Sequence, residues 1–354
     1  MLFQFVDLAF LSFFSLATLF FMRKVAKAIN LVDKPNARKQ HEGAIPLVGG
    51  ISICFSLLYF LFNNPNIIPN SDAYAGCIVL LVILGALDDK FDISFKVRFA
   101  VQALLSLAMM QLAHIELNTL GNMFGFGEVV LGWVGYPITI LAVIGAINAF
   151  NMVDGIDGLL GGLASVTFGA LAVLMINDNQ PELAYLCMVI VAVLLPYIIL
   201  NLGILGRKFK VFMGDAGSML IGFTVIWLLL LSSQNGSNPP LRPVTALWLI
   251  ALPLMDMAAI MIRRGRRGDS PFKPDREHLH HIFQNLGLTG HQTLVVICLL
   301  ASSFAAFGIW GEISKISEVT MFIMFLIAFA AYTSILAHIW RVSAFIKKIL
   351  LSIK

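Results

Sequence analysis

The sequence predicts an all-α fold, a polytopic bundle of about 11 transmembrane helices, and two observations support this prediction. Hydrophobic residues make up 59% of the 354 residues, with a mean hydropathy of +0.88. Apolar runs of about 17–22 residues recur along the chain, and a helix of that length crosses the roughly 30 Å hydrocarbon core of a bilayer. The second observation is charge, because 22 of the 24 Lys and Arg residues fall in one alternating set of inter-helix segments, as in cytoplasmic loops.

The predicted spans follow these runs in order. They cover residues 3–22, 45–62, 73–88, 97–113, 136–150, 159–177, 183–200, 216–232, 244–262, 292–310 and 319–339. The first span has no basic leader and is followed by Arg23 and Lys24, so we expect it to stay in the membrane as an anchor. An odd number of spans puts the termini on opposite sides of the membrane, and the charge bias then predicts a periplasmic N-terminus and a cytoplasmic C-terminus.

The segments between the spans differ in composition on the two sides. Basic residues follow the first, third, seventh, ninth and last spans, and only Arg242 and Lys315 lie on the other side. No soluble stretch is long enough to bury its own core, so residues 1–354 are predicted to form a single integral membrane domain. Its cytoplasmic loops, which are richest in functional groups, lie near 23–44, 88–98, 148–158, 201–217 and 263–291.

Acidic residues gather at the predicted cytoplasmic ends of the spans. They are Asp88 and Asp89 in GALDDKFDIS, Asp154 and Asp157 in NAFNMVDGIDGLLGG, Asp215 in KVFMGDAGS, and Asp256 near the end of the ninth span. Ionisable groups at membrane depth are costly, so a functional role is the first hypothesis. The alternative is that these acids cap helix ends or pair with cations of the loops.

The spacing of polar residues in the second acidic segment favours a metal or phosphate site. Asn151, Asp154 and Asp157 are three residues apart, which makes them neighbours on a helix. Oxygen-only side chains suit Mg²⁺, which takes one or two carboxylates and shares its remaining positions with water and substrate phosphates. Glycines beside Asp215 would let backbone amides approach a phosphate.

Basic and histidine-rich loops point to an anionic substrate. The loop 263–291 contains His278, His280 and His281 among several cations, without Cys or carboxylate partners at the spacing typical of a zinc site. We therefore favour phosphate recognition over zinc for these histidines. In the first loop, Arg38 and Lys39 are candidates for holding an anionic substrate, and the alternative is a loop that only sets topology.

Five motifs, PLVGG, ALDDKFDIS, NAFNMVDGIDGL, KVFMGDAGS and HLHH, occur in this order over nearly the whole chain. Together they resemble the polyprenyl-phosphate N-acetylhexosamine-1-phosphate transferases. The resemblance implies transfer of N-acetylglucosamine-1-phosphate from UDP-N-acetylglucosamine to undecaprenyl phosphate, with release of UMP. It also implies a bacterial inner membrane protein with its active site on the cytoplasmic face, at the first membrane step of glycan synthesis of the O-antigen or enterobacterial common antigen type.

The resemblance assigns roles to particular residues. Catalytic roles are expected for Asp88, Asp89, Asp154, Asp157, His278, His280 and His281. Mg²⁺, with Mn²⁺ as the alternative, is expected at Asp89, Asp154 and Asp215. The Phe212 ring is expected to pack on uracil, and the substrate-binding candidates are Arg38, Lys39, Lys96, Arg98, Asn151, Asn201, Phe212, Arg263 and Arg264.

Several alternatives remain open at this point. The donor could be another UDP-N-acetylhexosamine, although the His-Leu-His-His pattern differs from the three consecutive histidines of the peptidoglycan-precursor branch. An ion-coupled transporter would also place acids in apolar segments, but near the middle of the bilayer and not at one face. The CDP-alcohol phosphotransferase pattern is absent. Expected partners are the two substrates and membrane lipid but no nucleic acid, and a homodimer is left open.

Overall fold

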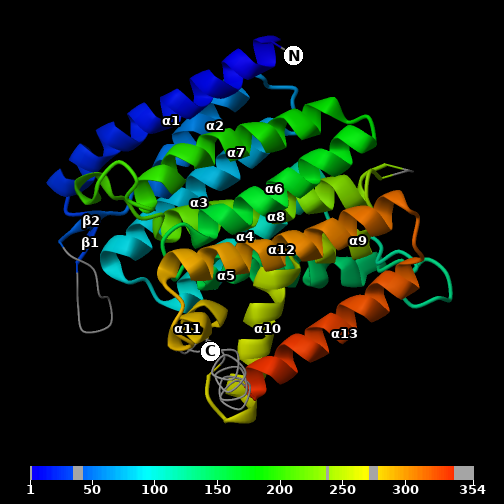
Figure 1. Cartoon of the computed structure of the whole chain (residues 1–354). Coiled ribbons are helices and arrows are strands. Elements are labelled where there is room, and N and C mark those ends of the chain that lie inside the picture. The colour runs from blue at the N-terminus through cyan, green and yellow to red at the C-terminus, as the bar shows by residue number, and fades with distance from the viewer. Residues whose placement is uncertain (1, 35–42, 237–238, 271–277, 339–354) are drawn as a thin grey trace.

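The computed structural model describes residues 2–34, 43–236, 239–270 and 278–338. The described chain is mostly helical (Figure 1). Its α-helices are α1 Leu2–Ala28, α2 Gly49–Asn63, α3 Ser71–Phe91, α4 Phe95–Ala113, α5 Gly135–Val153, α6 Leu159–Asn177, α7 Pro181–Asn201, α8 Gly214–Gln234, α9 Pro243–Leu249, α10 Ala251–Arg266, α11 Leu279–Asn285, α12 Gly290–Ile313 and α13 Glu318–Ala337. Short 3₁₀ turns, η1 Gly132–Val134 and η2 Arg207–Phe209, and an antiparallel pair of strands, β1 Val32–Asp33 and β2 Ile45–Pro46, complete it.

Each predicted span contains a helix, and the protein is a multi-pass helical membrane protein. In the described part of the chain, nine helices are long and apolar enough to cross a membrane, or ten if the bent pair α9 and α10 counts as one span. The second predicted span is the shorter helix α2, with 15 residues. The number of spans and the orientation of the termini stay predictions.

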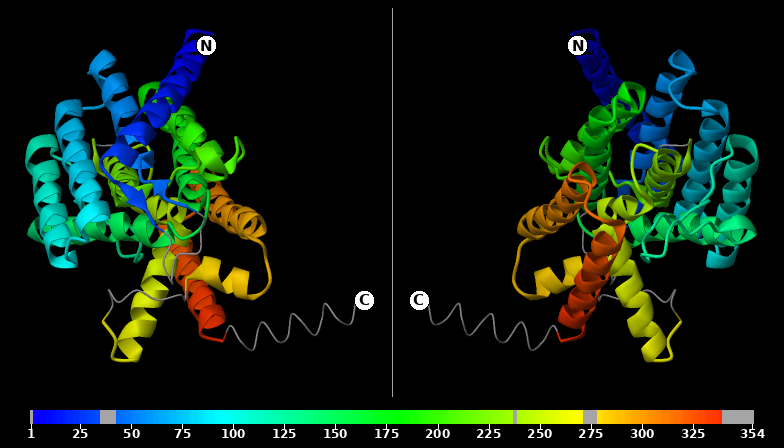
Figure 2. Two further views of the ribbon diagram at one scale, coloured as in Figure 1. Left: turned by 90° about the vertical axis from the view of Figure 1, so that its left-hand side faces the viewer. Right: turned by 90° about the vertical axis from the view of Figure 1, so that its right-hand side faces the viewer.

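The span predicted over 244–262 consists of two helices that meet at a sharp bend. Helix α9 ends at Leu249, and α10 leaves it at an angle of 81°. Pro253 explains the break, because in a continuous helix its ring would clash with the carbonyl of Leu249. As a result α10, together with α11 and α13, lies at one end of the molecule in both views of Figure 2.

Helix α8 is the centre of the bundle. Its most apolar stretch is 100% buried, against 17% in α1 and 22% in α13. A helix that is hydrophobic all round suits either a protein interior or lipid, and α8 lies in the interior because α2, α3 and α5 pack on it. The start of α8 carries Asp215 in its first turn, so the central helix fixes the position of one predicted site residue.

Glycines let the neighbouring helices approach the backbone of α8. A methyl group on Gly50 would overlap the backbone of Gly217, and one on Gly85 would overlap Ala216. Small residues permit such close packing between membrane helices. These contacts lie in the first turn of α8. Helices α2 and α3 therefore touch the segment that holds Asp215.

We expect Gly85→Ala to destabilise the protein, because overpacking a tight contact typically costs about 1–3 kcal/mol. The midpoint of thermal unfolding in detergent should fall by several degrees, and turnover should fall with it. Gly76→Ala is the matched control on the same helix, since a methyl group there meets no atom within 4 Å. If both variants melted like the parent protein, the proposed close packing against α8 would not be a constraint.

Candidate active site

The carboxylates of α3 meet the first turn of α8. The backbone N–H of Asp215 donates a hydrogen bond of 3.0 Å to Oδ1 of Asp89. Asp89 thus caps the N-terminus of α8, where the helix dipole favours a negative charge. Gly214 has a φ of 73°, and a methyl group there would collide with the Asp89 carboxylate. Glycine is therefore the residue that allows this contact.

Asn151 connects the end of α5 to the same turn of α8. Its side-chain amide donates to Oδ1 of Asp215 at 2.6 Å and to the hydroxyl of Ser218 at 2.7 Å. Asp154 follows directly as the C-cap of α5. Burial, and then the charges of Asp215 and Asp157, raise the pKa of Asp154 to about 7. The second and third acidic motifs therefore converge, as the sequence predicted.

Two other predicted catalytic acids are paired with cations. Nη1 of Arg98 donates to Oδ2 of the buried Asp88 at 2.6 Å. Nζ of Lys210 donates to Oδ2 of Asp157 at 2.5 Å. Lys96 is exposed in the first turn of α4, two residues before Arg98.

The sequence reasoning did not assign a role to Lys210 or Ser218. Lys210 is the first and Ser218 the last residue of the KVFMGDAGS motif, and this membership is the signal that could have identified them.

Asn201 has a structural position in place of the predicted substrate-binding role. It is buried, and its Oδ1 accepts from the N–H of Gly158 at 2.5 Å. Its Nδ2 donates to the carbonyl of Val211 at 2.8 Å. Since both polar groups of this side chain bind protein backbone, we reassign Asn201 as a clamp between the loop that starts α6 and the segment before α8.

The PLVGG and KVFMGD motifs pair with each other through their backbones. The N–H groups of Val48 and Gly49 donate to the carbonyl of Phe212 at 3.2 and 3.0 Å, and the N–H of Phe212 donates to Pro46 at 2.9 Å. The Phe212 ring is half-buried, and Nζ of Lys210 lies 5.3 Å from its centroid. An aromatic face beside a cation can stack on a nucleobase while the cation faces phosphate.

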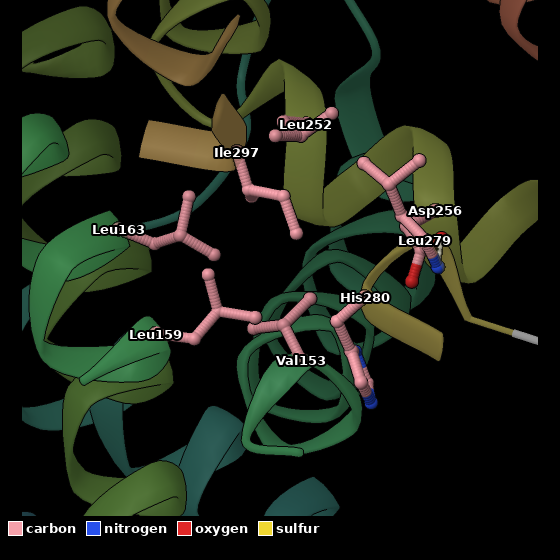
Figure 3. A pocket seen from close by; sticks show the side chains of 8 residues that line it. All are labelled: Val153, Leu159, Leu163, Leu252, Asp256, Leu279, His280 and Ile297. Atoms are coloured by element: carbon pink, nitrogen blue, oxygen red, sulfur yellow. Dashed lines mark hydrogen bonds between the residues drawn. The ribbon is translucent and has the colours of Figure 1, made fainter. Parts of the chain in front are cut away.

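The histidine motif lies against the loop that follows α5. His280 is buried, its Nε2 has no hydrogen-bond partner, and a methyl group on Gly155 would overlap that atom. Burial, and then the neighbouring His281 and His278, lower the pKa of His280 to about 3, so its ring is neutral at pH 7. Figure 3 shows His280 beside a small apolar hollow, with Asp256 and Val153.

The remaining predicted residues are less closely connected to this site. Arg264 is buried and Arg263 half-buried near the end of α10, and both already contact other groups of the chain. Arg38 and Lys39 lie outside the described residues. Their predicted substrate contacts stay predictions.

Comparison with known proteins identifies the family. A family model described as glycosyl transferase family 4 matches residues 72–233, which extend from α3 to α8. Three similar proteins are each named undecaprenyl-phosphate alpha-N-acetylglucosaminyl 1-phosphate transferase. The one from Yersinia pestis is 53% identical over 97% of this chain and 94% of its own length. The Escherichia coli K12 protein is 52% identical over the same shares, and the Pasteurella multocida protein is 49% identical over 94% and 93%.

The chain belongs to the polyprenyl-phosphate N-acetylhexosamine-1-phosphate transferase family. The resemblance inferred from the five motifs is therefore confirmed. As a member of this family the protein is a phosphoglycosyl transferase. The roles of the individual site residues stay predictions.

The carboxylates at the start of α8 fit a hard divalent cation. Oδ2 of Asp89 is buried without a hydrogen-bond partner, and the charge of Asp215 helps to raise the pKa of Asp154. Within the described residues, no group of three or more His, Cys, Asp or Glu side chains is arranged to hold a metal by itself. Mg²⁺ takes part of its shell from substrate phosphates and water, so protein side chains need not supply a complete set of ligands.

Asp154 makes the stability of the substrate-free protein depend on pH. Its folded-state pKa of about 7 lies above the ordinary value of 3.8, so its contribution is fully present below about pH 4 and is lost as the pH rises through 7. In buffer containing a chelator, we expect a higher midpoint of thermal unfolding at pH 6 than at pH 8. Asp154→Asn should remove part of this difference, and an unchanged dependence in that variant would show that other groups cause it.

Proposed function

We propose that this protein transfers N-acetylglucosamine-1-phosphate from UDP-N-acetylglucosamine to undecaprenyl phosphate. The products would be UMP and undecaprenyl-diphosphate-N-acetylglucosamine. One observation supports this most strongly: Asp89, Asn151, Asp154 and Asp215 converge at the start of α8 in a chain about half identical to transferases of that name. The resemblance also favours the first membrane step of glycan synthesis of the O-antigen or enterobacterial common antigen type.

Direct attack by the lipid phosphate is the mechanism that the chemistry favours. An oxygen of the lipid phosphate attacks the phosphorus that bears the sugar, and the bond from that phosphorus to the oxygen of UMP breaks. A phosphate monoester has a second pKa of about 6, so the acceptor is largely dianionic at neutral pH and needs little help from a base. Asp88 is held by Arg98 and Asp89 by the first turn of α8, which makes either one a poor free nucleophile.

The same residues can orient two anionic substrates. The N-terminus of α8 presents backbone N–H groups and a partial positive charge, which favour a phosphate. Lys210, which lies between Asp157 and the Phe212 ring, can place the donor nucleotide. The neutral His280 can offer a hydrogen bond to a phosphate without adding charge.

We further propose that Mg²⁺, or Mn²⁺ in its place, binds at Asp89, Asp154 and Asp215. When bound, this ion would offset the repulsion between the substrate phosphates and stabilise negative charge on the leaving group. The unpartnered Oδ2 of Asp89 and the unfavourable charge at Asp154 support these ligands.

We also propose a bacterial inner membrane location with the site on the cytoplasmic face. The site residues come from the ends of α3 and α5 and the start of α8, where the basic segments 90–98 and 207–210 also lie. Arg242, one of the two cations predicted outside, is paired with Glu312 between α9 and α12. A site at one face suits substrates from lipid and cytosol better than it suits a transporter with acids at the midplane.

Purified protein with undecaprenyl phosphate, Mg²⁺ and a panel of UDP-sugars tests the reaction. UMP release should be fastest with UDP-N-acetylglucosamine, should require the lipid, and should stop when a chelator removes the metal. Absence of UMP with every UDP-N-acetylhexosamine would rule out the proposed activity. A burst of UMP without lipid, equal to the enzyme concentration, would instead support a covalent aspartyl-phosphate intermediate.

Cysteine labelling tests the orientation. Ser314, exposed after α12, should react as cysteine with an impermeant reagent added to intact cells, because it lies on the predicted outer side. Ser270, exposed after α10, should react as cysteine only after permeabilisation. The native Cys54, Cys77 and Cys187 are buried, and Cys298, which is half-buried, is replaced by alanine in the protein used for labelling. The opposite labelling pattern would place the site outside the cell.

A further inference from the structure

Asp256 is a buried carboxylate that lies outside the cluster at α8. It belongs to α10, and partners from two other elements bind it. The hydroxyl of Tyr332 in α13 donates to its Oδ1 at 2.6 Å, and the N–H of Leu279 donates to the same oxygen at 3.2 Å. Its Oδ2 lies 2.9 Å from Nδ1 of His278. Burying a carboxylate is costly unless it is hydrogen-bonded, and these contacts provide hydrogen bonds to both of its oxygens.

The contact with His278 has a consequence for the imidazole ring. An ionised carboxylate only accepts hydrogen bonds, so Nδ1 of His278 must carry the proton. When the ring is neutral, Nε2 is then the acceptor. A carboxylate that binds Nδ1–H fixes both the tautomer and the orientation of a histidine. His278 is also the N-cap residue of α11, and the N–H of Leu279 binds the same carboxylate, so Asp256 anchors the start of this helix.

The ring contacts continue from Asp256 toward the site. The rings of His278 and His280 are nearly parallel, with centroids 5.7 Å apart, and the rings of His280 and His281 are 4.2 Å apart. His280 in turn lies against Gly155, a residue of the loop that leads from Asp154 to the start of α6. The side chains of Asp256 and His280 line one hollow in Figure 3. A shift of His278 would therefore move the histidines that face the carboxylate loop.

We propose that Asp256 is a positioning residue, which holds His278 as the Nδ1–H tautomer and fixes the histidine motif against the loop 154–158. Tyr332 binds the other carboxylate oxygen and connects α13 to this arrangement. The inference relies on the proposed function only for its activity measurement, because the tautomer of His278 can be measured without substrate.

Asp256→Asn tests the proposal with little change in shape. The amide oxygen can still accept from Leu279 and Tyr332, but the amide NH₂ then faces Nδ1 of His278. Nδ1 must become an acceptor, so the proton moves to Nε2. In ¹⁵N-histidine-labelled protein, the His278 signals, assigned by their loss in His278→Gln, should change from the Nδ1–H to the Nε2–H pattern. Turnover should fall on the order of 100-fold or more, as expected when a histidine is held in the wrong tautomer.

Two further variants separate positioning from a general structural role. Tyr332→Phe removes one hydrogen bond to Asp256 and leaves the His278 contact, so the tautomer should stay and turnover should fall less than about 5-fold. The double variant with Asp256→Asn and His278→Gln should have a turnover little lower than that of His278→Gln alone, since both substitutions act through one histidine.

The proposal is overturned if wild-type His278 is the Nε2–H tautomer, a measurement that needs no variant. It is also overturned if Asp256→Asn leaves the tautomer or turnover unchanged, or if the losses in the double variant multiply as independent effects. A wild-type protein that releases no UMP but shows the expected tautomers would refute the proposed function and not this inference.

Discussion

The contact of α2 and α3 with the first turn of α8 determines where the carboxylates of the site lie. The helices approach so closely at Gly50 and Gly85 that no side chain would fit there, and none would fit at Gly214 beside Asp89. The backbones can therefore approach until Asp89 accepts the N–H of Asp215. The helix dipole and the backbone N–H of Asp215 offset part of the cost of burying the Asp89 carboxylate among other acids, so the close packing of small residues makes this arrangement possible.

Charge compensation divides the acids into two groups. Asp88 has Arg98 and Asp157 has Lys210, so each of these acids is half of an ion pair. In the described part of the chain, no cation is paired with Asp154, whose raised pKa reflects burial and neighbouring acids. Unbalanced negative charge in a partly buried site is costly, and it persists in proteins where a ligand or ion supplies the balance. The asymmetry distinguishes the acids that hold the fold together from those suited to a cation.

Much of this arrangement could be predicted from the sequence, and the reasons are physical. The thickness of a bilayer sets the length of apolar runs, and the distribution of cations shows which loops share a face, so the convergence of Asp154 and Asp215 was predictable. The break before Pro253 is signalled by that proline, but the 81° angle depends on packing between α9, α10, α12 and α13. No local pattern encodes the distance that pairs Lys210 with Asp157. The same holds for the hydrogen bonds that the side-chain oxygen and nitrogen of Asn201 make inside the protein.

The break between α9 and α10 matters for the chemistry because it directs α10 toward α11 and α13. A straight helix would not bring Asp256 to the N-terminus of α11 at the end of the bundle where His280 meets the carboxylate loop. His280 is buried and its ring is neutral, so this histidine can hydrogen-bond a phosphate without contributing charge. For the proposed reaction, Lys210, Arg98, the N-terminus of α8 and a bound cation would offset the charge of the two phosphates. His280 would help to orient these phosphates, and the groups around the start of α8 would supply the electrostatic stabilisation.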